Sequence, residues 1–564
     1  MKNYNKIIKS VCFSVVLLFA TSCNNFLDIT PEDQLVLENY YTSAEAIDNN
    51  TASLYTVSTW VDFSMLFMWQ ANDELAGDLY YTNGDEGQFY LMTLQNGNTI
   101  LTQGWNGLYR VISFCNNIIN NMPGAAQKNG IDEKYINRGL AEARCIRAMA
   151  YFLLTEYWQD VPIIVDNNMS VYDIVRHKQS SVYEFIRHDL EFAKDNLPEK
   201  PFEAGRCSKY TAIGLLAKLH LTMASHLSDA SSSANFTKAK EYAQEVITKS
   251  GFSLYPDLKT MFYPVANNSE ESLLSIQAIC NGWGTGNGLN QAYARSSAVN
   301  LIDGWGGWKG PTLSLQEAFN EEPADARRPI TYMRNGDHYD NLGGGSYSYV
   351  NVNSVEQVNP MLAHLRKYVI GSNKDCDNKA GSNQDAGNNL YLLRLTDVYM
   401  CYIEACIGSG TSTSDALALD VFKKVRDRAK LTTTNTSITY DELIKERRKE
   451  FALECINYFD IKRMAYRNTD KALQYLNGMK RWRQYSTNPR NGTTETDLNA
   501  SNIWHGGFTV EKPDTDNGII GSVYFYDDNS IEVNVTKENL VLPIPAETIT
   551  KTPKILQDPA DYQF

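Results

Sequence analysis

The chain has 564 residues and a formal net charge of −14 at pH 7, with 43% hydrophobic and 21% charged residues. This balance is typical of a globular protein and excludes a fibrous or wholly disordered chain. The acidic charge, without a long run of Lys or Arg, argues against a nucleic-acid partner.

The first 22 residues predict a lipoprotein signal peptide. Three lysines, Lys2, Lys6 and Lys9, precede an apolar stretch from Val11 to Ala20 that is too short to span a bilayer. Small residues then lead directly to Cys23, which we expect to carry the lipid. An ordinary signal peptide followed by an incidental cysteine is the alternative. Multiple acyl chains would tether the rest of the chain stably to a membrane.

Helix signals dominate long regions of the chain. Thr42, Ser181 and Thr439 each precede a glutamate by three residues, which is the spacing of a capping box at a helix start. Apolar residues recur at steps of three and four from Ser181 to the helix-stopping Pro198. The stretches Tyr210–Ala224 and Ala416–Ala429 repeat this pattern.

The helices are dense enough to predict the fold class. At least five follow one another between about Trp105 and Ile247. We therefore expect a mainly α fold, with stacked helix pairs that resemble tetratricopeptide units, long inserted loops and minor β structure, although the strict 34-residue consensus is absent. A short alternating segment, Ser522 to Val535, predicts a hairpin or strand pair.

Two long segments, Ile279–Thr312 and Gly343–Gly387, are rich in glycine and polar residues. Loops of this length in a compact protein are usually functional or mobile. We predict an N-terminal helical region over residues 23–260 and a C-terminal region with the ligand loops over residues 261–564, packed as one unit.

Motifs of common enzymes are missing from the sequence. It contains no G-x-S-x-G elbow, no H-E-x-x-H pair and no phosphate-binding P-loop. The oxygens of Asn373, Asp375, Asp377 and Asn378 could hold calcium, but a solvated polar loop explains them better. We predict no catalytic residue, no cofactor and no metal. Most cysteines fall in apolar helical stretches and are expected to be buried, with Cys376 the most exposed.

Several segments, in the same order along the chain, resemble the SusD/RagB family of nutrient-binding outer-membrane lipoproteins. The resemblance rests on Asn24–Asp28 after the lipid cysteine, on Trp105–Ile119, Ala141–Pro162, Leu390–Ala405, Val425–Leu431 and Glu446–Arg463, and on the ending LPIPAETITKTPKILQDPADY. The ending departs from the family pattern at Thr552 and Asp558. Arg394, Asp397 and Glu404 on one late helix, and Glu446, Arg447, Glu450 and Asp460 on another, are expected to form buried ion pairs.

The resemblance implies a helical glycan-binding protein whose aromatic rings contact the sugar. A flat ring covers the C–H face of a sugar, while polar side chains satisfy its hydroxyls. The implied ligand-binding residues are Asn72, Asp73, Tyr80 and Tyr81 in an early loop, and Trp283, Tyr293, Trp305 and Trp308 in a mid-chain loop. Trp305 is the strongest candidate, because glycines on both sides would let a ligand approach its face.

The leading hypothesis is therefore a non-enzymatic lipoprotein on the outer surface of the outer membrane. It would capture an oligosaccharide and deliver it to a SusC-like, TonB-dependent β-barrel transporter. Three alternatives remain open: a peptide-binding member of the same family, a helical surface glycoside hydrolase, and a scaffold that only binds proteins.

Overall fold

The structure is a computed structural model that describes residues 40–81, 84–226, 230–334, 336–349, 363–382, 384–481, 484–486, 507–511, 523–527 and 533–564. The predicted signal peptide and Cys23 lie outside these residues. Within the part of the chain that is described, no helix is both long and apolar enough to cross a membrane.

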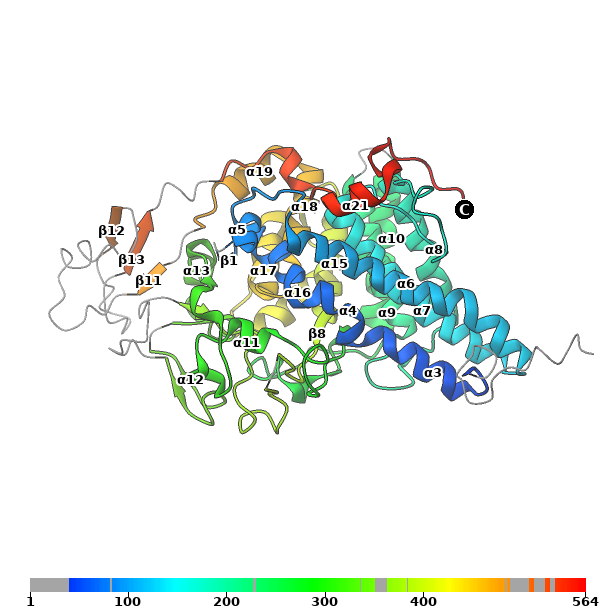
Figure 1. The fold of residues 1–564 in the computed structure, drawn as a ribbon. Helices are drawn as coiled ribbons and strands as arrows, with labels where there is room; N and C mark the ends of the chain where they lie inside the picture. The colour runs from blue at the N-terminus through cyan, green and yellow to red at the C-terminus, as the bar shows by residue number, and fades with distance from the viewer. Residues whose placement is uncertain are drawn as a thin grey trace, which may run out of the picture.

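Five long helices form the stack of helix pairs predicted for the first half of the chain. They are α6 (Thr99–Lys128), α7 (Glu133–Trp158), α8 (Gln179–Asn196), α9 (Lys209–His226) and α10 (Ala230–Lys249). Each packs against the next along the chain, and α6 and α7 run side by side in Figure 1. Helix α9 is buried on nearly every side because its sequence is apolar all round.

A second set of helices completes the scaffold. They are α15 (Leu395–Ile407), α16 (Ala416–Arg428), α17 (Tyr440–Phe451), α18 (Asn457–Arg467) and α19 (Thr469–Asn477). Helix α15 packs against α9 and α10, and α18 packs against α9. A single hydrophobic cluster therefore extends from Tyr41 to Ile555, and the fold is mainly α, as predicted.

Buried ion pairs join these late helices. Predicted residues pair with one another as Arg394–Glu450 at 2.8 Å and Arg447–Asp397 at 2.7 Å, whereas Glu404 pairs with Arg463, which was not among them, at 2.9 Å. Burial alone would raise the pKa of Asp397, but Lys218 and Arg447 hold it well below its ordinary value. Two residues lie on other elements than predicted: Arg394 is the last residue of a strand, and Asp460 lies in the first turn of α18.

Strands are short and pair across long sequence distances. The buried pair β2 (Ser272–Ile276) and β8 (Leu390–Arg394) is antiparallel, as is β1 (Leu79–Tyr80) with β3 (Gly310–Pro311). The others pair as β4 (Tyr332–Met333) with β7 (His364–Leu365), β5 (His338–Tyr339) with β6 (Tyr347–Ser348), and β9 (Ser412–Thr413) with β10 (Ile438–Thr439). Near the C-terminus, β13 (Val523–Asp527) lies between β11 (Gln484–Ser486) and β12 (Gly507–Glu511). The segment predicted as a hairpin thus contributes one strand to a three-stranded sheet.

Short helices fill the connections. They are α3 (Ala44–Ala52), η1 (Ser53–Tyr55), α4 (Val57–Asp62), η2 (Phe63–Phe67), η3 (Gln70–Glu74), α5 (Gly84–Tyr90), η4 (Pro264–Ala266), α11 (Leu289–Tyr293), α12 (Ser297–Asn300), η5 (Gly306–Trp308), α13 (Leu313–Asn320), α14 (Arg328–Thr331), η8 (Lys537–Leu540), α21 (Ala546–Lys551) and η9 (Pro553–Leu556). Both η2 and η3 are π-helical turns, which widen the helix and redirect side chains.

One of the three predicted capping boxes is correct. Thr439 caps α17 with the reciprocal hydrogen bonds of a capping box. Helix α3 is instead capped by Ser43, one residue after the predicted Thr42. Ser181 lies inside α8, where its hydroxyl accepts a hydrogen bond from the backbone N–H of Tyr562 at 3.1 Å.

That contact belongs to a C-terminal segment that returns to the first half of the chain. The indole nitrogen of Trp158 donates to the carbonyl of Pro543 at 2.9 Å, and the N–H of Lys178 donates to the carbonyl of Ala560 at 2.9 Å. The C-terminus consequently lies beside α8 (Figure 1).

The eight cysteines of the described residues are free thiols. Most are buried, as predicted, but the prediction for Cys376 is wrong. Its sulfur lies 3.0 Å from the carbonyl oxygen of Ser372 in a packed turn, and Cys280 is the exposed cysteine instead.

Candidate functional site

Trp283 lies at the tip of a glycine turn and is 61% exposed. Gly282 and Gly284 have φ of 95° and 80°, a region that glycine enters without steric cost. The N–H of Gly282 donates to the carboxylate of Asp385 at 2.6 Å, and the carbonyl of Gly284 accepts from the hydroxyl of Ser58 at 2.9 Å. The base of the turn is therefore fixed, and its indole projects into solvent.

Trp305 is the second exposed indole, with 44% of its surface accessible. Its ring nitrogen donates to a carboxylate oxygen of Asp303 at 2.5 Å, and its backbone N–H donates to the carbonyl of Gln291 in α11 at 2.9 Å. Both the backbone and the ring orientation are thus fixed before any ligand arrives. We refer to residues 279–308 as the aromatic loops.

The glycines beside Trp305 serve the packing of the backbone. A Cβ on Gly306 would lie 2.2 Å from the carbonyl oxygen of Tyr293, and one on Gly304 would lie 2.6 Å from the carbonyl carbon of Ser296. These are impossible contacts, so glycine is needed for the chain to lie against α11 and α12. The sequence-based interpretation, in which the glycines let a ligand approach, is replaced by this one.

The structure brings part of the early loop beside the mid-chain segment, because β1 pairs with β3. Tyr80 is half-buried, with its ring in edge contact with Tyr90 at 5.2 Å. Tyr81 is also half-buried, and its ring lies 4.6 Å from the ammonium of Lys309. Burial lowers the pKa of Lys309, against the opposing effect of Glu86. Both tyrosines keep an accessible edge.

Three predicted ligand-binding residues are buried instead. Tyr293 is 0% exposed, and Asn72 and Asp73 are turned into the core by η3. Asn72 donates to the hydroxyl of Tyr157, and Asp73 accepts from the N–H of Cys455 at 3.3 Å. Burial, followed by the nearby carboxylate of Asp78, raises the pKa of Asp73 well above its ordinary value. The structure corrects the prediction for these three residues, because none has surface for a ligand to contact.

Two exposed apolar residues of the aromatic loops were not predicted. Ile279 and Leu301 are both more than half exposed. An isolated Ile or Leu in a loop follows no periodic pattern, so the sequence carried no signal for them. The backbone of Trp308 belongs to η5, and its side chain lies outside the described part of the structure.

In the polar loop around residue 375, side-chain oxygens of Asp375 and Asn373 accept hydrogen bonds from nearby backbone N–H groups, and the second carboxylate oxygen of Asp375 is buried without a partner among the described residues. One carboxylate oxygen of Asp375 accepts from the N–H groups of Gly344 at 2.9 Å and Ser372 at 2.7 Å, and the side chain of Asn373 accepts from the N–H of Ala380 at 3.0 Å. In the described residues, no group of three or more His, Cys, Asp or Glu side chains is placed to hold a metal ion.

Chemically, the aromatic loops offer flat apolar faces with polar rims. Trp283 and Trp305 present accessible indoles on loops with fixed backbones. Such rings favour ligands that combine an apolar face with hydroxyl groups, and a fixed ring loses little conformational entropy on binding.

Two family models match the chain. One, described as the SusD family, matches residues 280–560, and the other, described as starch-binding associating with outer membrane, matches residues 25–221. Together they cover both halves of the scaffold and the aromatic loops.

Relatives match over nearly the full length. A SusD-like protein of Bacteroides ovatus is 31% identical over 563 residues, which cover 98% of each chain. SusD-like protein P2 of Formosa agariphila is 27% identical, over 83% of this chain and 92% of its own. A crystal structure with xylogluco-oligosaccharide is 27% identical and has a TM-score of 0.78, covering 92% of this chain and 99% of the other.

Proposed function

The chain belongs to the SusD family, and on that premise we propose that it is a cell-surface lipoprotein that binds an oligosaccharide on its aromatic loops. In this proposal it delivers the bound glycan to a TonB-dependent outer-membrane transporter. The single observation that carries the glycan site is the Trp305 indole, which is exposed and held by Asp303 at 2.5 Å.

Trp305 is joined by Trp283, with Tyr80 and Tyr81 as secondary contacts at the β1–β3 edge. The side chain of Trp308 remains a candidate from the sequence alone. The 27% identical structure with xylogluco-oligosaccharide supports a β-glucan-type oligosaccharide as the first ligand to test.

Attachment to the outer membrane rests on the sequence around Cys23 and on the description of the family model that matches residues 25–221. We propose that the thiol of Cys23 carries the lipid. Labelling of whole cells with a palmitate analogue should mark the wild-type chain and leave Cys23→Ala unmarked. A labelled Cys23→Ala chain would place the lipid elsewhere.

We also propose that the protein binds without turnover. An assay for new reducing ends, run with purified protein and each polysaccharide it binds, should stay at the level of the buffer control. A steady release of reducing ends would favour the glycoside hydrolase alternative.

Isothermal titration calorimetry against a panel of oligosaccharides that includes xylogluco-oligosaccharide tests the glycan site directly. Trp305→Ala and Trp283→Ala should each lower affinity by about tenfold or more, equivalent to about 1.4 kcal/mol. Tyr172→Ala is the matched control, because Tyr172 is an exposed ring (67%) in the connection between α7 and α8. Binding of peptides in place of every glycan would overturn the proposal.

A further inference from the structure

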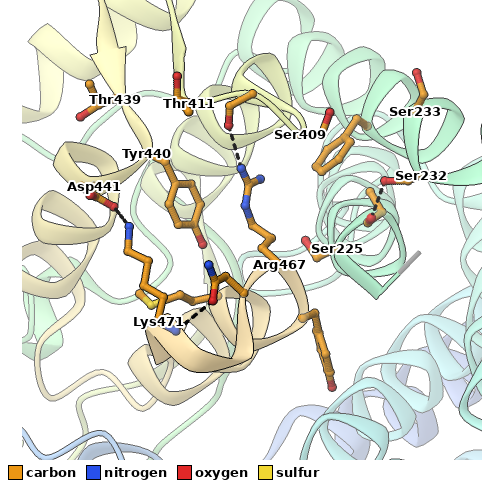
Figure 2. Close-up of a pocket in the computed structure, with 16 residues that line it drawn as sticks. Ser225, Ser232, Ser233, Ser409, Thr411, Thr439, Tyr440, Asp441, Arg467 and Lys471 are labelled. Atoms are coloured by element: carbon orange, nitrogen blue, oxygen red, sulfur yellow. Dashed lines mark hydrogen bonds and ion pairs between the residues drawn. The ribbon is translucent and has the colours of Figure 1, made fainter. Parts of the chain in front are cut away.

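A cavity of about 770 Å³ lies among the end of α9, the start of α10, the end of α18 and the starts of α17 and α19. We call it the polar cavity, and Figure 2 shows its lining. In Figure 1, α19 lies at the top and α10 in the upper right part, whereas α11 and α12 lie in the lower left part. The polar cavity is therefore separate from the aromatic loops, and its volume is in the range of small-molecule sites.

Hydroxyl groups dominate one wall of the polar cavity. The hydroxyl of Ser225 donates to the carbonyl of Leu221 at 3.0 Å, and that of Ser232 donates to the carbonyl of Ala224 at 2.7 Å. Each hydroxyl donates its only proton to a backbone carbonyl, so its oxygen can act only as an acceptor toward a ligand. This wall suits a ligand that brings its own hydroxyl donors.

Arg467, at the end of α18, supplies a positive charge to the lining. Its guanidinium donates to the carbonyls of Gly408 and of Gly410, the latter at 3.0 Å, and lies 4.2 Å from the ring centroid of Tyr440. Within the described residues, no carboxylate lies within ion-pair distance of Arg467. The guanidinium is therefore positioned by neutral groups and keeps its full charge for a ligand.

The second cation of the lining is already neutralised. Lys471 forms an ion pair with Asp441, whose side chain is 66% exposed. The start of α19 is also here, capped by Asn468, and a helix N-terminus favours negative charge. Asp470 in the first turn of α19 offsets part of this dipole, so Arg467 supplies the main positive charge of the cavity.

The hydroxyl of Tyr440 is buried and has no hydrogen-bond partner among the described residues. Only 7% of the residue is exposed, and Figure 2 shows its ring projecting between Arg467 and Lys471. A buried hydroxyl without a partner is costly, so a turn of the Tyr440 ring toward the cavity would be favoured by the hydrogen bond that an occupant offers it.

We propose that the polar cavity is a second carbohydrate site, selective for an acidic sugar of the uronic acid class. The carboxylate of the sugar pairs with Arg467, its ring hydroxyls meet the serine wall and the hydroxyl of Tyr440, and its C–H face lies toward the ring of Phe236. This inference goes beyond the proposed function, which concerns neutral glycan on the aromatic loops, and does not depend on it.

Titration calorimetry of the full mature chain with D-glucuronate, D-glucose and acetate tests the site. We expect glucuronate to bind at least tenfold more tightly than either other probe. Tyr440→Phe removes only the unpartnered hydroxyl, so it should fold normally by thermal melting and bind glucuronate about tenfold more weakly. An oligouronide of several units tests whether the natural ligand is a polymer or a monosaccharide. Tighter binding than glucuronate indicates a uronic acid within a polysaccharide, and weaker binding indicates the free monosaccharide.

A variant that is expected to bind more tightly provides a test that misfolding cannot imitate, because a misfolded protein would lose affinity. Asp441→Asn frees Lys471 and should strengthen glucuronate binding severalfold, with glucose binding unchanged. Asp420→Asn is the matched control, because it frees Lys424 from a similarly exposed surface pair on α16. Trp305→Ala should leave glucuronate affinity unchanged even if neutral glycan binding is lost. Equal affinities for the three probes, or a Tyr440→Phe variant that binds like the wild type, would overturn the inference.

Discussion

The indole nitrogen of Trp305 donates a hydrogen bond to the carboxylate of Asp303 at 2.5 Å, two residues away. An exposed tryptophan on a loop would otherwise sample several rotamers, and a ligand would have to select one of them. The hydrogen bond to a charged acceptor fixes the ring plane in advance.

We therefore expect Asp303→Ala to weaken glycan binding by about fivefold through loss of ring orientation, a smaller effect than removal of the indole. Thermal stability should change little because the contact is exposed. Titration calorimetry should show the loss mainly as a less favourable entropy of binding. An affinity equal to wild type would mean that the ring is held by other contacts.

Gly306→Ala tests the packing of the aromatic loops on α11. The new Cβ would lie 2.2 Å from the carbonyl oxygen of Tyr293, so the segment carrying Trp305 must shift. We expect a lower melting temperature and at least tenfold weaker glycan binding. Gly97→Ala is the control, since open space surrounds the Cβ position there, and it should leave both quantities unchanged.

Tyr293→Phe tests the burial of a residue that the sequence placed in the ligand site. The Tyr293 hydroxyl is buried without a partner among the described residues, so its removal should leave the free energy of unfolding unchanged or raise it by about 1 kcal/mol. Glycan affinity should equal that of the wild type. A clear loss of affinity would show that the ring becomes accessible when ligand binds.

The buried ion pairs predict that the free energy of unfolding falls in acid. Burial alone would raise the pKa of Glu450, but Arg428, Arg394 and Arg327 hold it well below its ordinary value. Glu322 likewise has its pKa lowered to about 2 by contacts with Arg426 and Lys449 that outweigh partial burial. Their stabilisation is complete above the unfolded-state pKa of about 4.3 and is lost as pH falls toward 2. Denaturant unfolding at pH 7, 4 and 3 should show this decline.

Glu450→Gln tests the contribution of the buried ion pairs to stability without a change of pH. It removes the carboxylate that the buried Arg327, Arg394 and Arg428 share. Arg394 keeps Glu271 and Glu454, and Arg428 keeps Glu271, but the buried cluster loses one negative charge, so we expect a loss of about 3 kcal/mol in the free energy of unfolding at pH 7. Lys423→Gln, which breaks an exposed pair with Asp427 on α16, is the control and should cost less than about 1 kcal/mol.

Much of the helical scaffold was predictable because helix signals depend on residues that are close together in the sequence. The apolar periodicity after Ser181 and the capping box at Thr439 require only neighbouring residues, and the stack of α6 to α10 follows from them. Cap assignment failed at Thr42, because the adjacent Ser43 caps α3, and at Ser181, because α8 begins two residues earlier, where the N–H of Gln179 donates to the carboxylate of Asp160.

The site was predicted less completely because exposure depends on tertiary packing. The sequence supplies an indole at Trp305 and a ring at Tyr293, twelve residues apart, but only the position of α11 makes one accessible and the other buried. The inward turn of Asn72 and Asp73 arises from the π-helical turn η3, which no residue pattern foretold. The polar cavity draws its walls from two parts of the chain, residues 224–236 and residues 409–471, which are far apart in the sequence.

The contacts between the C-terminal segment and the first half of the chain also affect the order of folding. They join Pro543 to Trp158 and Ala560 to Lys178. Pro543 follows Trp158 by 385 residues in the sequence, so the helix stack can form while the edge of α8 that faces the C-terminal segment is still uncovered. Contacts so distant in sequence form late and slowly. Before the C-terminal segment has packed, this edge of α8 is therefore open to proteases and to contacts with other chains.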